Sequence, residues 1–175
     1  MTVSDSHPPT SRRRWFQFSL RALFGLTTAV ALLFAWFGNQ YRQGQRAKAA
    51  IEELGGSASI WNHWDYRWGR AINADLSETD VGDQELATIV ELPIFGALRL
   101  DGTAVTDEGL AHIQKLADLR SLSISDTDVS DEGLEHLKRA GKLVMLQAHR
   151  TRITDGGVAE LERALPELEV YYTAR

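Results

Sequence analysis

The chain has 175 residues, of which 43% are hydrophobic, and it contains no cysteine. The lack of cysteine excludes disulfide scaffolds, thiolate metal sites and cysteine nucleophiles, although it identifies no compartment. Residues 1–38 carry four arginines and one aspartate, whereas residues 39–175 hold 15 basic and 23 acidic residues. Because nucleic-acid binding depends on clustered Lys and Arg, this acidic body argues against DNA or RNA as a partner.

After a basic, disordered tail (residues 1–14), the first predicted element is a transmembrane helix over residues 15–38. No charged residue occurs between Ala22 and Gly38. A helix from Trp15 to Phe37 is about 34 Å long, against about 30 Å for a hydrocarbon core. Trp15 and Trp36 are spaced to lie at the two membrane interfaces. The alternatives are a buried core helix, which rarely has so long an uncharged run, and a cleaved signal peptide, whose apolar region is normally shorter.

The arginines that flank this segment predict its orientation. Three arginines precede the segment and a fourth lies near its N-terminal end, and three basic residues follow it. These residues are Arg12, Arg13, Arg14 and Arg21, and then Arg42, Arg46 and Lys48. The positive-inside rule therefore favours a signal anchor in the cytoplasmic membrane, with the N-terminus cytoplasmic and the C-terminal part outside.

Two short regions follow the predicted anchor. Residues 39–56 are rich in helix formers and end at Gly55 and Gly56, so we expect a spacer helix that either forms a stalk or lies along the membrane. Residues 57–71 concentrate the aromatic residues Trp61, Trp64 and Trp68. They either form an N-terminal cap, as an added strand over the first repeat, or expose a platform that stacks against sugar rings.

The remainder of the chain repeats with a period of 24 residues. The segments VTDEGLAHIQKL, VSDEGLEHLKRA and ITDGGVAELERA begin at Val105, Val129 and Ile153, and a weaker copy begins at Val81, where Glu85 replaces the repeated glycine. Alternating apolar residues in each unit predict a half-buried strand, and the three-residue spacing that follows predicts a helix. Such units bury their apolar stripe only by stacking, which predicts a parallel strand ladder inside and helices outside.

The pattern L-x-x-L-x-L-x-x-T-x-[VI]-[ST]-D-x-G-[LV]-x-x-[LI] resembles the leucine-rich repeat, in the short ribonuclease-inhibitor-like form found in bacterial proteins. The resemblance covers residues 72–175 and implies an α/β solenoid of about four repeats that follows the transmembrane helix. Thr103, Thr127 and Thr151 depart from the family pattern, which usually has Asn or Cys there. We expect their hydroxyls to satisfy backbone groups at the bend after each strand.

The sequence contains no motif that predicts catalysis, a cofactor or a metal site. Ser123, Asp101 and His149 are residue types of a catalytic triad, but two repeats separate the aspartate from the histidine. His112 and His136 occupy equivalent helix positions without a further ligand, and the acidic residues near Asp126 lack calcium-loop spacing. We therefore expect a non-enzymatic protein with no bound metal or cofactor.

The outward residues of the strand ladder form the candidate binding surface. They differ from repeat to repeat, as a recognition surface does, although an unconstrained surface would look the same. The residues concerned are Arg99, Asp101, Ser123, Ser125, Met145, Gln147, His149 and Tyr171.

The sequence thus predicts a single-pass membrane protein that binds a protein partner through its concave strand face. The wider arrangement is similar to small membrane-anchored repeat proteins of bacteria. The alternative is a cell-envelope carbohydrate-binding protein that uses Trp61, Trp64 and Trp68. No cap is evident after the last predicted strand, so we also expect that self-association through the C-terminal end of the solenoid is possible.

Overall fold

The computed structural model describes residues 20–61, 71–91 and 95–174. The chain forms two compact units, Met1–Asn39 and Gln40–Arg175. The repeats predicted from the sequence all lie in the second unit.

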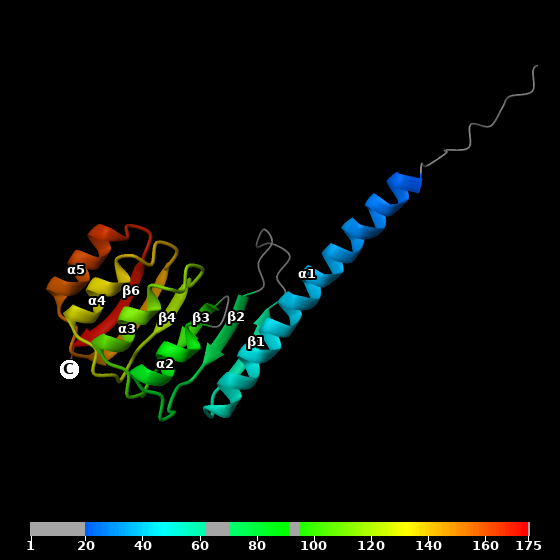
Figure 1. Ribbon diagram of the computed structural model, residues 1–175. Coiled ribbons are helices and arrows are strands. Elements are labelled where there is room, and N and C mark those ends of the chain that lie inside the picture. Colours follow the sequence, from blue (N-terminus) through cyan, green and yellow to red (C-terminus); the bar gives the residue numbers. More distant parts are fainter. Residues whose placement is uncertain (1–19, 62–70, 92–94, 175) are drawn as a thin grey trace, which may run out of the picture. The chain divides into compact units, whose positions relative to one another are not determined.

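Helix α1 runs without interruption from Leu20 to Glu53, where the sequence predicts an anchor and a separate spacer helix (Figure 1). It ends at Gly55, whose φ of 82° is left-handed, and Gly55 and Gly56 donate their N–H groups to the carbonyls of Glu52 and Ile51. In the part of the chain that the structure describes, no helix is long and apolar enough to cross a membrane. Residues 15–19 of the predicted span lie outside that part, so the anchor stays a prediction.

A six-stranded sheet runs through the second unit in the order β1-β2-β3-β4-β5-β6. Strand β1 pairs antiparallel with β2, and each later strand pairs parallel with the one before it. The strands are β1 (Ser57–Trp61), β2 (Ala71–Asp75), β3 (Phe95–Arg99), β4 (Ser121–Ser123), β5 (Met145–Thr151) and β6 (Glu169–Ala174).

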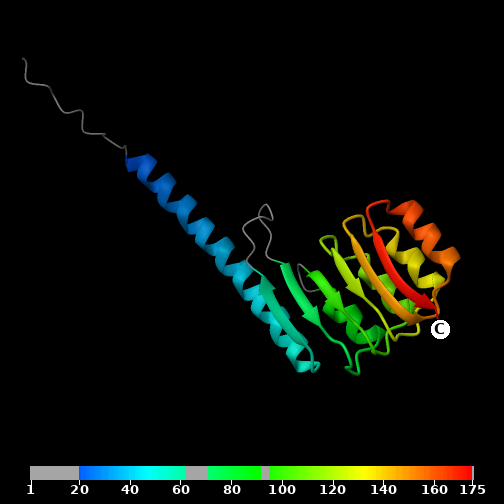
Figure 2. The same cartoon turned by 180° about the vertical axis from the view of Figure 1, so that it is seen from behind.

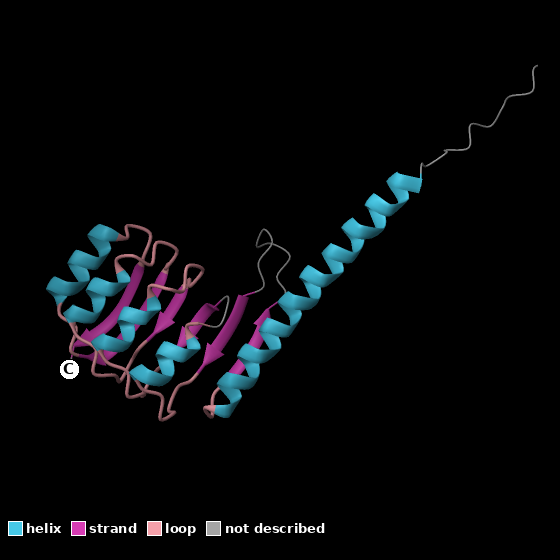
Figure 3. Ribbon diagram, in the orientation of Figure 1, coloured by secondary structure: helices cyan, strands magenta, loops and turns pink. Residues whose placement is uncertain are grey.

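Helices cover one face of the parallel strands and leave the other face open (Figures 2 and 3). They are α2 (Asp83–Ile89), α3 (Asp107–Ile113), α4 (Asp131–Leu137) and α5 (Asp155–Ala164). The alternation of strand and helix, with a strand register that advances by 24 residues, confirms the predicted α/β solenoid. Its strand ladder and helix layer are of the leucine-rich-repeat type.

The core lies between the sheet and the helices. Leu98, Leu122 and Leu146 are in register on neighbouring strands and are fully buried. At the β1 end, Ala47 and Ile51 of α1 are also fully buried in this core. The C-terminal part of α1 therefore helps to close the first repeat, a role that the sequence predicts only for residues 57–71.

The threonines that depart from the family pattern bond to the backbone, as expected. Thr103, Thr127 and Thr151 each donate a hydroxyl hydrogen bond to the carbonyl oxygen three residues earlier, over 2.7, 2.6 and 3.0 Å. All three threonines are buried, so each hydroxyl satisfies its own hydrogen-bonding capacity and that of a backbone carbonyl within one repeat.

We expect Thr127→Val to lower the free energy of unfolding by about 1 kcal/mol, because the substitution keeps the shape and leaves the Ile124 carbonyl without its donor. Urea unfolding of the full chain in detergent measures this change. Thr88→Val, at an exposed helix position, is the matched control and should unfold like the wild type. Equal stability of the two variants would contradict the role of the buried hydroxyl.

An aspartate at the start of α2, α3 and α4 joins each of these repeats to the next. Asp107 accepts hydrogen bonds from the backbone N–H and the hydroxyl of Ser130, both at 2.7 Å, and from the N–H of Gly133 at 3.0 Å. Asp83 binds Thr106 in the same way, and Asp131 binds Thr154. We call these contacts the aspartate links.

The repeated glycine is explained by these links. A Cβ atom on Gly109, Gly133 or Gly157 would lie no more than 2.5 Å from the carboxylate oxygen of the preceding repeat's aspartate. In the first copy no preceding aspartate needs this space, and Glu85 occupies the position. Its carboxylate accepts the N–H of Gly82 at 3.0 Å and so caps its own helix.

Candidate protein-binding surface

The open face of the strand ladder carries the predicted binding residues in the predicted columns. Arg99, Ser123, Gln147 and Tyr171 are register partners on β3 to β6. A second column holds Ala97, Ser121, Met145 and Glu169. The structure thus brings Arg99, Met145, Gln147 and Tyr171 of the predicted set onto one surface, which we call the concave face, and their role in binding stays a prediction.

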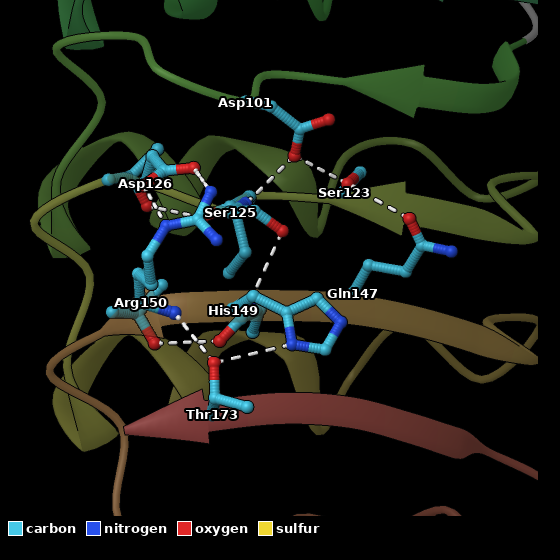
Figure 4. Close-up of polar contacts among 12 residues, drawn as sticks. Asp101, Ser123, Ser125, Asp126, Gln147, His149, Arg150 and Thr173 are labelled. Atoms are coloured by element: carbon cyan, nitrogen blue, oxygen red, sulfur yellow. Dashed lines mark hydrogen bonds and ion pairs between the residues drawn. The ribbon is translucent and has the colours of Figure 1, made fainter. Parts of the chain in front are cut away.

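The β2–β4 half of the concave face is held by its own hydrogen bonds. Arg99 binds Asp75 and Asp101, each at 3.1 Å. Asp101 also accepts the hydroxyl of Ser123 at 2.5 Å and the N–H of Ser125 at 2.8 Å (Figure 4). Only 4% of Ser123 is exposed, which corrects its prediction as an outward contact. These groups already satisfy one another, so this half offers few free contacts.

The pKa of Asp75 reflects its neighbours in this half of the concave face. Burial acts to raise the pKa of Asp75, but hydrogen bonding by Ser77 and the positive charge of Arg99 outweigh burial and hold that pKa below its usual value. Asp75 therefore stays ionised and paired with Arg99 at neutral pH.

The residue types of a triad do not come together as a relay. The hydroxyl of Ser123 is directed to Asp101, with the side-chain oxygen of Gln147 at 3.4 Å. The ring Nδ1 of His149 instead lies 3.4 Å from the hydroxyl of Thr173, and its backbone N–H donates to Ser125 (Figure 4). The serine is therefore not placed for activation by this histidine.

The β5–β6 half of the concave face differs, because large side chains are exposed there. Tyr171 is 47% exposed. Gln147 and Glu169 are exposed and Met145 is half-buried. The Tyr171 hydroxyl donates to Glu169 at 2.9 Å, and this hydrogen bond, together with the negative charge of Glu169, raises the pKa of Tyr171. We call Met145, Gln147, Glu169 and Tyr171 the exposed patch.

A column of left-handed residues at the strand ends was not found from the sequence. Glu78, Gly102, Asp126 and Arg150 have φ values between 55° and 67° and follow one another at intervals of 24 residues. Arg150 forms a two-pronged ion pair with Asp126, with Nε to Oδ1 at 2.5 Å (Figure 4). The 24-residue spacing signals the column, but a charged residue with positive φ is uncommon enough to be missed.

The acidic and histidine residues weighed as metal ligands do not form a cluster in the described segments, where no group of three or more such side chains could hold a metal ion. Asp126 is paired with Arg150 as above. Glu160, which occupies the position equivalent to His112 and His136 in the last repeat, pairs with Lys138 at 3.3 Å.

The predicted carbohydrate site falls largely outside the described residues. Trp64 and Trp68 lie in the segment 62–70, and Trp61 ends β1 without a described side chain. The tryptophan platform therefore stays a prediction.

The comparisons with known proteins add structural likenesses to solved structures. No family model matches the chain, and no curated protein matches it. The solved structure of internalin C2 from Listeria monocytogenes is similar to it with 26% sequence identity and a TM-score of 0.39, over 52% of this chain and 38% of that protein. The chain thus spans well under half the length of this neighbour, and the repeat geometry described above carries the assignment of the fold.

Proposed function

We propose that this protein is a non-catalytic protein-interaction module, anchored by residues 15–38 in a bacterial cytoplasmic membrane, with its repeats outside. The exposed patch is the observation that carries the binding part of this proposal. Protein interfaces are enriched in Tyr and Met at their centres, and hot spots gather where such side chains are surrounded by polar neighbours.

The two halves of the concave face have different roles in this proposal. The β2–β4 half keeps its shape through the bonds among Asp75, Arg99 and Asp101, and so provides a rigid support. The exposed patch next to it supplies the contacts, with Tyr171 as the anchor residue. Binding to a preformed surface of this kind loses little conformational entropy.

The membrane part of the proposal is supported by the apolar side chains that α1 exposes. Phe24, Leu32 and Phe34 are between 66% and 73% exposed, and Leu26 and Leu33 are also exposed. A contiguous apolar surface of this kind is typical of a site that contacts lipid or another protein. The arginines at positions 12, 13, 14 and 21 support a cytoplasmic N-terminus.

A photo-crosslinking residue at Gln147 tests the partner and the topology together. We expect a reproducible protein adduct in the membrane fraction, and the compartment of the captured protein reports the side on which the repeats lie. The same probe at Glu135, on the opposite face in α4, should give no such adduct.

The matched variant in this experiment is Tyr171→Ala combined with the probe at Gln147. Loss of a central anchor should reduce the adduct by about tenfold or more, whereas Thr88→Ala should leave it unchanged. An adduct that is equally strong from Gln147 and Glu135, or that Tyr171→Ala does not reduce, would contradict binding at the exposed patch.

A further inference from the structure

Strand β6 has a free edge in the described part of the sheet, where it pairs with β5 only (Figure 2). The N–H of Glu169 donates to the Val144 carbonyl at 3.0 Å, so Glu169 turns its backbone groups toward β5. Because backbone groups alternate along a strand, the N–H and C=O groups of Val170 and Tyr172 point away from β5. This edge can therefore accept another strand.

The edge lacks the features that usually prevent such pairing. The six residues of β6 include no proline or lysine, and the one charged residue, Glu169, lies at the start. By contrast, the opposite end of the sheet carries the antiparallel strand β1 and the buried residues Ala47 and Ile51 of α1. Unprotected edge strands are templates for pairing with another chain.

We propose that β6 pairs antiparallel with β6 of a second copy of this chain, about a twofold axis at Tyr171. This register places Tyr171 opposite Tyr171, Val170 opposite Tyr172, and Glu169 opposite Thr173 of the second copy. Because side chains alternate with a period of two, it keeps the exposed residues of both copies on the concave side and the core residues on the helix side.

The side chains of β6 fit this register. An aromatic pair on the axis stabilises an antiparallel ladder, and the Thr173 hydroxyl can donate to the Glu169 carboxylate of the other copy. The two Glu169 residues lie at opposite ends of the paired segment, roughly 14 Å apart along the strand at about 3.4 Å per residue. The pairing thus joins the two edges without placing like charges opposite one another.

Single-cysteine crosslinking of the full chain in detergent tests the register, because the chain has no cysteine of its own. In Tyr171→Cys the two thiols would lie in a non-hydrogen-bonded pair, with Cα atoms about 4.5 Å apart, within the range for a disulfide. We expect this variant to form a disulfide-linked dimer under mild oxidation. Thr88→Cys, on the exposed side of α2, controls for random collision and for association through α1, and should form the dimer much more slowly.

Placing a positive or a negative charge at position 173 distinguishes pairing in this register from a nonspecific effect of net charge. Thr173→Lys faces Glu169 of the second copy and should speed the crosslinking of Tyr171→Cys, whereas Thr173→Glu should slow it, with about tenfold between the two. The same exchange at Thr88 alters the net charge equally and should change the rate little. Crosslinking of Tyr171→Cys no faster than that of Thr88→Cys, or equal effects of the charge exchange at both sites, would overturn the proposal. The assay contains no other protein, so its result is independent of partner binding at the exposed patch.

Discussion

Gly133→Ala should destabilise the repeats by about 3 kcal/mol, although alanine is the better helix former by up to about 1 kcal/mol. The new Cβ atom would lie 2.5 Å from Oδ1 of Asp107, 2.9 Å from Cγ1 of Val129 and 3.1 Å from Cδ1 of Leu110. The first contact breaks an aspartate link, and the other two overfill the core. Thermal unfolding followed by circular dichroism measures the loss.

Gly141→Ala is the matched control for this variant. Gly141 is exposed, a Cβ atom added to it would meet no heavy atom within 4 Å, and its backbone does not require a positive φ. Its replacement should leave stability unchanged or raise it slightly, because alanine reduces the entropy of the unfolded chain. A Gly133→Ala protein as stable as Gly141→Ala would show that the carboxylate moves aside without cost and would contradict our account of the repeated glycine.

Asp107→Ala should lower the free energy of unfolding by a similar amount, about 3 kcal/mol, because it removes an ionised acceptor of three hydrogen bonds. The half-buried N–H of Ser130 then loses its acceptor at the repeat junction. Hydrogen exchange should report the loss locally, with faster exchange of the Ser130 amide than of the corresponding amide of Thr154.

Asp118→Ala removes an aspartate of the same kind from the surface and serves as the control. Asp118 pairs with Lys142 at 2.5 Å, but about half of each side chain is exposed, so the pair contributes little in water. If Asp107→Ala were no less stable than Asp118→Ala, the aspartate links would not hold the repeats together. In the double variant Asp107→Ala with Gly133→Ala, we expect a smaller loss than the sum of the single losses, because the two residues share one contact.

The sequence was sufficient for the parts of the fold that repeat. Leucines at a constant spacing, such as Leu98, Leu122 and Leu146, predict both the ladder and its register, because stacked units bury equivalent residues together. The same spacing predicted the columns of the concave face. The spacing predicts which residues of the exposed patch point outward, but not how exposed they are. The exposure of Tyr171 depends on the side chains that the adjacent strand places beside it.

Contacts between repeats could not be predicted in this way. The sequence alone does not identify the role of these aspartates, because an aspartate in the first turn of a helix is common and within one repeat Asp107 has no partner that the sequence identifies. Its partner Ser130 is 23 residues later and becomes adjacent only when two repeats are stacked. The burial of Ser123 was missed for the same reason, since Asp101 reaches it from the previous repeat. The continuity of α1 was missed because the change from apolar to polar composition near Gly38 marks no change in backbone structure.

The aspartate links also give the solenoid a direction of assembly. Each helix from α3 onward has its first turn bonded by an aspartate of the repeat before it, and in each of these bonds the later repeat donates to the earlier one. Helix α2 belongs to the first copy, where the Glu85 carboxylate accepts the N–H of the N-cap residue Gly82. Folding that begins at α2 can therefore be templated repeat by repeat toward the C-terminus, which is the order in which a ribosome releases the chain.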